Sequence, residues 1–273
     1  MSATSAVIQI SKTEPTDAQK RIAETKRVIA ERFEVLELLT NACMEGTTRS
    51  LIVSGPPGLG KSYTIFNKLA AWDPTETQYS ITKGYMKATG LYKLLYKHRF
   101  QKHVLVLDDT DMIFFDDTSL SLLKAVCDTT KDRIVSWKTE AIMFTEDGNE
   151  QLPKSFLFEG ACIFLTNNDF DHLIAKGDKR SPHLEAMMSR SHYIDLAMKT
   201  RQDFLIRIYQ VVREGLLSPL SVQAQTEIMT YLATNMMTMR EMSLRMAIKL
   251  KDLYMTRPND WKRIADVTCR KKA

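Results

Sequence analysis

The sequence has few cysteines and no long hydrophobic run. The four cysteines of the 273 residues lie far apart and lack the spacing of metal ligands, which argues against a disulfide framework or a zinc site. We expect free thiols in a reducing compartment. No apolar run approaches the length of a membrane span, and residues 1–16 are polar, without the apolar core of a signal peptide. These absences favour a cytoplasmic protein that does not contact a membrane.

The sequence also lacks a strong excess of one charge. Its formal net charge of +5 permits contact with nucleic acid but does not require it. Hydrophobic residues at 44% and charged residues at 26% are ordinary for a globular protein. The sequence has no internal repeats, no low-complexity tract and no histidine pair at metal-ligand spacing. Composition therefore predicts a globular protein, and only its motifs indicate a chemistry.

The most specific motif is a glycine-rich segment that follows a short apolar run. Leu51–Val53 suits a buried strand, residues 55–62 read Gly-Pro-Pro-Gly-Leu-Gly-Lys-Ser, and Lys61–Ala71 suits a helix. In such a loop the backbone N–H groups surround phosphate oxygens, Lys61 reaches the β- and γ-phosphates, and Ser62 ligates Mg²⁺. The alternative is a glycine turn that only joins two elements. We assign binding of the cofactor ATP to Gly55, Pro56, Pro57, Gly58, Leu59, Gly60, Lys61, Ser62 and Tyr63.

Two adjacent carboxylates follow the next strongly apolar segment. Val104–Leu107 predicts a buried strand, and Asp108 and Asp109 come directly after it. Downstream of a phosphate loop, one such carboxylate supports Mg²⁺ and the other orients or deprotonates the attacking water. We assign Asp108 to the metal and Asp109 to the water; two solvated acids at a strand end are the alternative. The acids of the following loop are expected to cap the next helix rather than touch nucleotide: Asp111, Asp116 and Asp117.

Strand and helix patterns alternate as far as about Leu196, and only helical patterns follow. The alternation predicts an α/β fold, a parallel P-loop sheet flanked by helices. One of its helices is expected at Ser119–Asp128, with Asp117 or Thr118 as N-cap. The final helical unit is too short to fold comfortably alone, so we expect it to pack on the α/β part. The expected parts are a loose tail at 1–16, an α/β domain at 17–198 and a helical domain at 199–273.

A third apolar segment ends in the polar residues Thr166, Asn167 and Asn168. With the two earlier motifs in this order, the chain resembles the AAA+ ATPase superfamily. The resemblance covers about residues 33–255 and implies an α/β domain followed by a small all-α lid. It also implies that Asn167 is the "sensor 1" residue that helps to place the attacking water, with Asn168 as the close competitor. Taken alone, an Asn pair at a strand end is typical of a turn.

The same resemblance assigns roles to two arginines. Arg190, within Ala-Met-Met-Ser-Arg-Ser, matches the arginine finger that completes the site of a neighbouring subunit, and Arg180 is the weaker candidate. Arg240 matches the "sensor 2" arginine of the lid, which contacts phosphate within its own chain. A surface salt bridge is the alternative for each arginine. Residues 83–137 also resemble ATPases encoded by bacteriophages, and the whole resembles a minimal clamp-loader or helicase-loader module.

Two regions are candidates for contact with a substrate. Residues 83–87 read Lys-Gly-Tyr-Met-Lys and match the position where AAA+ rings that thread polymers carry an aromatic loop. Tyr85 can there grip a peptide or contact a nucleic-acid backbone, whereas the alternative is a glycine turn whose Tyr packs on its neighbour. Residues 133–158 read as a β-hairpin or extended loop that resembles insertions near the pore of some AAA+ proteins. The acidic tip of this hairpin argues against nucleic acid there.

The resemblance therefore implies a homo-oligomeric, Mg²⁺-dependent ATPase that remodels or loads a protein or protein–DNA assembly. The superfamily usually has Glu where this chain has Asp109, and the shorter side chain suits slow hydrolysis. The alternative function is accordingly an ATP-dependent loader or switch on DNA with low hydrolysis of its own. A small-molecule kinase shares the phosphate loop but leaves Asn167, Arg190 and the helical unit without a role.

Overall fold

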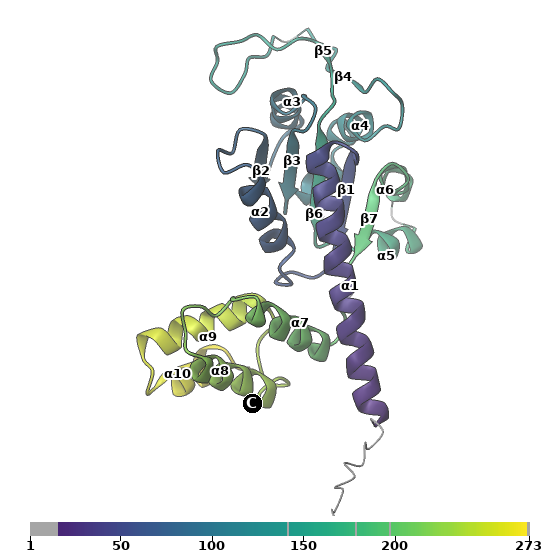
Figure 1. Cartoon of the computed structure of the whole chain (residues 1–273). Helices are drawn as coiled ribbons and strands as arrows, with labels where there is room; N and C mark the ends of the chain where they lie inside the picture. Colours follow the sequence, from purple (N-terminus) through teal and green to yellow (C-terminus); the bar gives the residue numbers. More distant parts are fainter. Residues whose placement is uncertain (1–15, 141, 178, 197, 272–273) are drawn as a thin grey trace, which may run out of the picture.

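The computed structural model describes residues 16–140, 142–177, 179–196 and 198–271 (Figure 1). Except for Thr16, the expected tail lies outside the described residues. Thr16 is the N-cap of a 29-residue helix, α1 (Asp17–Glu45), and its hydroxyl accepts a hydrogen bond from the N–H of Gln19. Gly46 ends this helix at φ 77°, in the left-handed region that favours glycine. Neither α1 nor any other helix in the described ranges is both long and apolar enough to span a bilayer.

Five parallel strands form the central sheet in the order β2-β3-β6-β1-β7. The strands are β1 (Ser50–Ser54), β2 (Tyr79–Lys83), β3 (Val104–Asp108), β6 (Ala161–Thr166) and β7 (His192–Asp195). The three central strands are buried along their whole length, and their middle residues are all apolar because both faces of each strand are covered. Their side chains alternate between two cores, with Ile52 and Leu105 in one and Leu51 and Val106 in the other.

Helices cover both faces of the sheet (Figure 1). Helices α1 and α2 (Lys61–Trp72) pack on the core that contains Leu51. The opposite core is covered by α3 (Ala88–Lys97), α4 (Asp117–Val126), α5 (Phe170–Ala175) and α6 (Ser181–Met188). The predicted α/β class is confirmed. The strands β1, β6 and β3 are neighbours in the sheet and run in the same direction. Their carboxyl ends therefore lie side by side and bring together the segments that begin at residues 55, 167 and 109.

The connection between β3 and β6 carries further elements. A 3-10 helix, η1 (Asp111–Phe115), precedes α4, whose N-cap is Asp116 rather than Asp117 or Thr118. The Asp116 carboxylate accepts hydrogen bonds from the N–H and hydroxyl of Ser119 at 2.8 and 2.6 Å, and the helix starts at Asp117, two residues before the expected Ser119. The expected hairpin is confirmed as antiparallel β4 (Ile134–Ser136) and β5 (Ser155–Leu157). Figure 1 shows it at the end of the sheet far from α7–α10.

The described residues after 200 form four helices. These are α7 (Arg201–Arg213), α8 (Val222–Thr234), α9 (Leu244–Thr256) and α10 (Trp261–Thr268). They share a core that contains Leu232 and Trp261, and Asn235 and Arg257 are the C-caps of α8 and α9. Figure 1 shows this part facing the carboxyl ends of the strands, with α7 beside α1. The division into domains at 17–198 and 199–273 stays a prediction.

The histidine that ends α3 makes the fold sensitive to acid. His98 is 1% exposed, and its Nε2 lies 2.6 Å from the hydroxyl oxygen of Ser80. Burial lowers the pKa of His98 to about 4. Because the unfolded chain takes up this proton near pH ~6.5, the free energy of unfolding falls as the pH falls from about 6.5 to about 4.

We predict that His98→Gln, which keeps an amide near Ser80, reduces this acid-induced loss by about 2 kcal/mol. The measurement is denaturant unfolding at about pH 7.5 and about pH 4.5, with exposed His172→Gln as control. The prediction would be contradicted if the free energy of unfolding fell by the same amount between the two pH values in His98→Gln, His172→Gln and the unmodified protein.

Candidate functional site

Residues 55–60 form a loop between β1 and α2 in which glycine is required at two positions. Gly58 and Gly60 have φ of 80° and 94°, in the left-handed region. A Cβ on Gly58 would lie 2.5 Å from the Cβ of Ser243, and one on Gly60 would lie 2.8 Å from Cδ1 of Leu244. The glycines therefore allow both the conformation of the loop and the close approach of α9. Helix α2 begins at Lys61, so the positive end of its dipole faces this loop.

The ammonium group of Lys61 is buried inside the loop. The residue is 6% exposed, and its Nζ donates hydrogen bonds to the carbonyl of Gly55, to the carbonyl of Pro56 at 3.1 Å and to Oδ1 of Asn167 at 2.9 Å. Burial lowers the pKa of Lys61 to about 8, against the opposing effect of the two aspartates after β3. The loop thus holds a cation on neutral oxygen acceptors that a phosphate can replace.

Ser62 and Asp108 come together as the metal assignment requires. The Ser62 hydroxyl donates a hydrogen bond to Oδ1 of Asp108 at 3.0 Å, and Asp108 is 3% exposed. A hydroxyl and a carboxylate are hard oxygen ligands that suit Mg²⁺, which keeps several waters and shares phosphate oxygens. Within the described ranges no group of three or more His, Cys, Asp or Glu can hold a metal. The pair therefore fits Mg²⁺ bound together with a phosphate, rather than a site built of protein ligands alone.

Asn167 connects Lys61 to Asp109. Its Nδ2 donates a hydrogen bond to Oδ1 of Asp109 at 2.7 Å, while its Oδ1 accepts from Lys61. Asp109 has φ 52°, a left-handed conformation that is costly for a residue other than glycine, and its N–H donates to the carbonyl of Leu165 at 3.2 Å. The three side chains thus form a continuous polar chain at the carboxyl edge of the sheet.

Asn168 and Asp111 lie beside these hydrogen-bonded side chains but have different roles. Asn168 donates its N–H to Oγ1 of Thr166 at 3.0 Å and accepts from the hydroxyl of Ser54 at 2.8 Å, so it forms the turn and leaves the cleft to Asn167. Asp111, expected to cap a helix, does not do so. Burial raises the pKa of its carboxyl, partly offset by Thr166, and its Oδ1 has no hydrogen-bond partner among the described residues. Asp111 is thus a third acid near Asp109, and no sequence pattern indicated this position.

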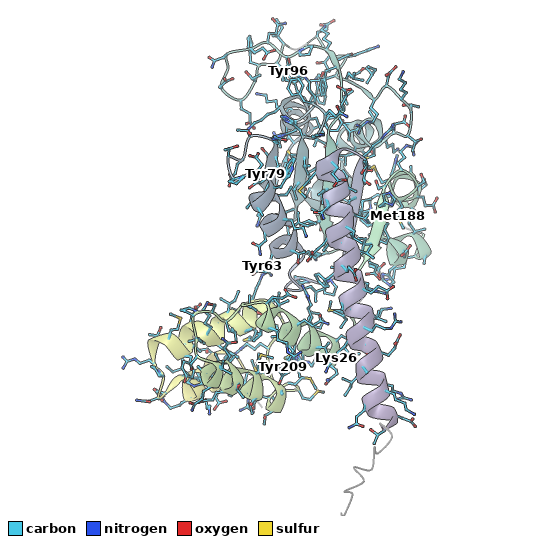
Figure 2. The ribbon with its side chains drawn as sticks, viewed as in Figure 1. Lys26, Tyr63, Tyr79, Tyr96, Met188 and Tyr209 are labelled. Carbon is cyan, nitrogen blue, oxygen red and sulfur yellow. The ribbon has the colours of Figure 1, made fainter. Side chains whose placement is uncertain are left out.

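The N-terminus of α9 closes the cleft opposite the loop. Ser243 is its N-cap and accepts a hydrogen bond from the N–H of Met246 at 3.1 Å, while the N–H of Leu244 donates to the carbonyl of Gly58 at 2.8 Å. The next residue, Arg245, therefore faces the cleft. The cleft is lined by Pro57, Gly58, Leu59, Gly60, Lys61, Ser62, Tyr63, Asp108, Asp109, Asn167, Leu216, Leu244, Arg245 and Ile248. Figure 2 shows Tyr63 at the end of α2 that faces the helical part.

Arg240 is not among the residues that line the cleft in this structure, and its assignment as the lid arginine stays a prediction. It is exposed, and its N–H donates to the carbonyl of Cys269 at 2.8 Å, which ties its segment to the end of α10. Helix α9 begins at Leu244 instead of near Arg240 because Ser243 is the N-cap. A serine before an apolar helical pattern is the signal that would have located Arg245.

Arg190 lies near the amino-terminal ends of the strands, whereas the cleft lies at their carboxyl ends. The pairing of β1 with β7 aligns Leu51 with His192, and the carbonyl of Arg190 accepts a hydrogen bond from Ser50 at 3.0 Å. Its Nη1 donates to the carbonyl of Ala186 at 2.8 Å. The cleft is about 15 Å away, the length of a five-residue strand. Arg190 therefore does not serve the cleft of its own chain, and its action on a neighbouring chain stays a prediction.

Tyr85 lies on the loop that follows β2. The residue is 73% exposed, so it does not pack on its neighbours as the alternative for this turn requires. Gly84 before it has φ 87°, and a Cβ there would meet no atom within 4 Å. This loop begins at the carboxyl ends of the strands, where the cleft also lies, because Lys83 pairs in register with Asp108.

The chain matches no model of a known protein family. It is 34% identical over 253 residues to an uncharacterized 36.7 kDa protein in the nrdC-mobD intergenic region of Enterobacteria phage T4, a similarity that covers 91% of this chain and 77% of that protein. The chain belongs to the family of this phage T4 protein. The relative is thus encoded by a bacteriophage, and its name states no activity.

Among solved structures, the chain is similar to NtrX from Brucella abortus. One NtrX crystal structure is 13% identical with a TM-score of 0.41 and covers 86% of this chain. The NtrX complex with ATP is 12% identical with a TM-score of 0.39, and the complex with ADP is 12% identical with a TM-score of 0.40. The chain spans about half the length of these proteins, at 54%, 57% and 50%.

The contact between Gly58 and Ser243 yields a prediction for stability. Gly58→Ala adds both backbone strain at φ 80° and a clash at 2.5 Å, so we expect a loss of about 3 kcal/mol in the free energy of unfolding. Gly84→Ala has similar strain without a clash and is expected to lose about 1 kcal/mol. Calorimetric unfolding of both variants compares them directly. Equal losses would mean that α9 does not rest on the loop in solution.

Proposed function

We propose that this protein is an AAA+-type ATPase that binds Mg-ATP in the cleft between residues 55–62 and α9 and hydrolyses it in an assembly of identical chains. The observation that carries this proposal is the hydrogen-bonded chain from Lys61 through Asn167 to Asp109, beside the Ser62–Asp108 pair. The strand order supports it, because β6 lies between β1 and β3 and so places Asn167, the assigned sensor residue, between Lys61 and Asp109.

Each side chain of the cleft has a role in this proposal. Lys61 and the N–H groups of the loop bind the phosphates, and Arg245 adds positive charge from α9. Asn167 fixes the Asp109 carboxylate, so that its free oxygen can orient or deprotonate the attacking water. Mg²⁺, held by Ser62 and Asp108, would neutralise charge on the phosphates. Charge that develops on the transferred phosphoryl group is then stabilised by fixed cations.

A second candidate function is an ATP-dependent switch with slow turnover that loads a partner onto DNA. The observation that favours it is the Asp109 carboxylate, which is one methylene shorter than Glu and has one oxygen already held by Asn167. For either function the substrate is proposed to be a protein or a protein–DNA assembly. DNA-stimulated, salt-sensitive ATPase activity supports the loader, whereas indifference to DNA contradicts it.

The binding test compares two lid arginines. We expect Lys61→Ala to abolish binding of a fluorescent ATP analogue and Arg245→Ala to weaken it about tenfold, the value of one charge-assisted hydrogen bond. Arg240→Ala, five residues earlier and outside the cleft, is expected to stay within about twofold. A larger loss with Arg240→Ala than with Arg245→Ala would contradict the assignment to α9.

The sharing of sites between chains is tested by mixing variants. Arg190→Ala is expected to bind ATP normally but to lose turnover by about 10³-fold or more, because the arginine acts on the neighbouring chain. Mixed with Lys61→Ala, it is expected to regain part of the activity, since some interfaces then combine an intact loop with an intact arginine. Arg180→Ala serves as the comparison. In the unmodified protein the guanidinium of Arg180 lies over the Phe115 ring, with Cζ 4.0 Å from the ring centroid. Normal turnover of Arg190→Ala would contradict the shared site.

A further inference from the structure

A lysine outside the phosphate loop lies against the carboxylate assigned to the metal. Nζ of Lys83 is 3.2 Å from Oδ2 of Asp108, whose other oxygen accepts the hydrogen bond from Ser62. The contact follows from the sheet, because Lys83 is the last residue of β2 and pairs in register with Asp108 at the end of β3. Both oxygens of this buried carboxylate are thus engaged by the chain itself.

The two partners of this ion pair differ in their surroundings. The Asp108 side chain is 4% exposed, whereas the Lys83 side chain is 57% exposed. Lys83 also lies over the ring of Phe66, with Nζ 4.6 Å from the ring centroid, and Phe66 is one helical turn beyond Ser62 on α2. The ammonium group is therefore held at the mouth of the site and can leave toward solvent, while the carboxylate cannot.

We propose that Lys83 is the resident counter-ion of Asp108 and that a divalent cation bound with nucleotide displaces it. Two cations at the same carboxylate repel each other, so a metal that uses Asp108 weakens the hold on Lys83, and Lys83 in turn lowers the affinity for the metal. The inference rests on the proposed function, since it concerns the metal of the same nucleotide site.

Displacement of Lys83 removes a contact that holds the loop carrying Tyr85 against the sheet. Lys83, Gly84 and Tyr85 are consecutive, and Gly84 has φ 87° with no atom within 4 Å of a Cβ placed there, so nothing packs against the turn at that point. Tyr85 is 73% exposed. Met86, the next residue, packs against the core, so the ion pair at Asp108 and the Met86 side chain hold the two ends of the short segment that carries Tyr85. Release of the ion pair frees the first of these ends and thereby couples the metal-nucleotide state to the candidate substrate-contact residue.

The test measures metal affinity without relying on activity. Free Mn²⁺ is titrated by electron paramagnetic resonance in the presence of the full chain and ADP, for the unmodified protein, Lys83→Met and Lys87→Met. Lys83→Met removes the charge but keeps an unbranched side chain, and Lys87→Met removes an equal charge from the same loop. We expect Lys83→Met to bind Mn²⁺ about tenfold more tightly and Lys87→Met to stay within about twofold.

Hydrogen exchange of the peptide that contains residues 83–90 provides a second readout. In the unmodified protein its exchange is expected to rise when Mn–ADP is added, and in Lys83→Met it is expected to be high from the start. Unchanged or weaker Mn²⁺ binding by Lys83→Met, with ADP still bound, would overturn the inference alone. Absence of ADP binding by the unmodified protein, with and without metal, would refute the proposed function together with the inference.

Discussion

The buried ammonium group of Lys61 is the constraint on which the site depends. A lysine that is 6% exposed needs acceptors close by, and this one finds them on the carbonyls of Gly55 and Pro56 and on Asn167. Burial lowers the pKa of Lys61, and the nearby carboxylates oppose this shift only in part. An anion with several oxygens relieves this cost better than the chain does, which is why phosphate is the ligand we propose.

The sheet and the helical part place the groups around this lysine. Because β6 lies between β1 and β3, Asn167 is within hydrogen-bond distance of both Lys61 and Asp109. The hydrogen bond from Leu244 to Gly58 brings α9 onto the loop, with Arg245 in the cleft. The phosphate loop thus contacts α9 directly, and Asp108, which accepts a hydrogen bond from Ser62, contacts the end of β2 through Lys83.

The sequence predicted the parts that depend on local pattern. The apolar runs that end at Ser54, Asp108 and Thr166 are buried strands whatever surrounds them, and the loop glycines follow directly from them along the chain. The sequence did not predict the positions at the cleft of three further residues, because these positions depend on tertiary contacts; the residues are Arg245, Lys83 and Asp111. Arg245 depends on where α9 begins and docks, Lys83 on the register of two strands, and Asp111 on its burial near Asp109.

The most direct test of the central claim is a crystal structure with Mg²⁺ and a slowly hydrolysed ATP analogue. The account predicts phosphate oxygens in contact with the N–H groups of residues 58–62. It further predicts that Lys61 has left the carbonyls of Gly55 and Pro56 for phosphate, with Ser62 and Asp108 at the metal. A nucleotide bound elsewhere, with the hydrogen bonds of Lys61 unchanged, would contradict it.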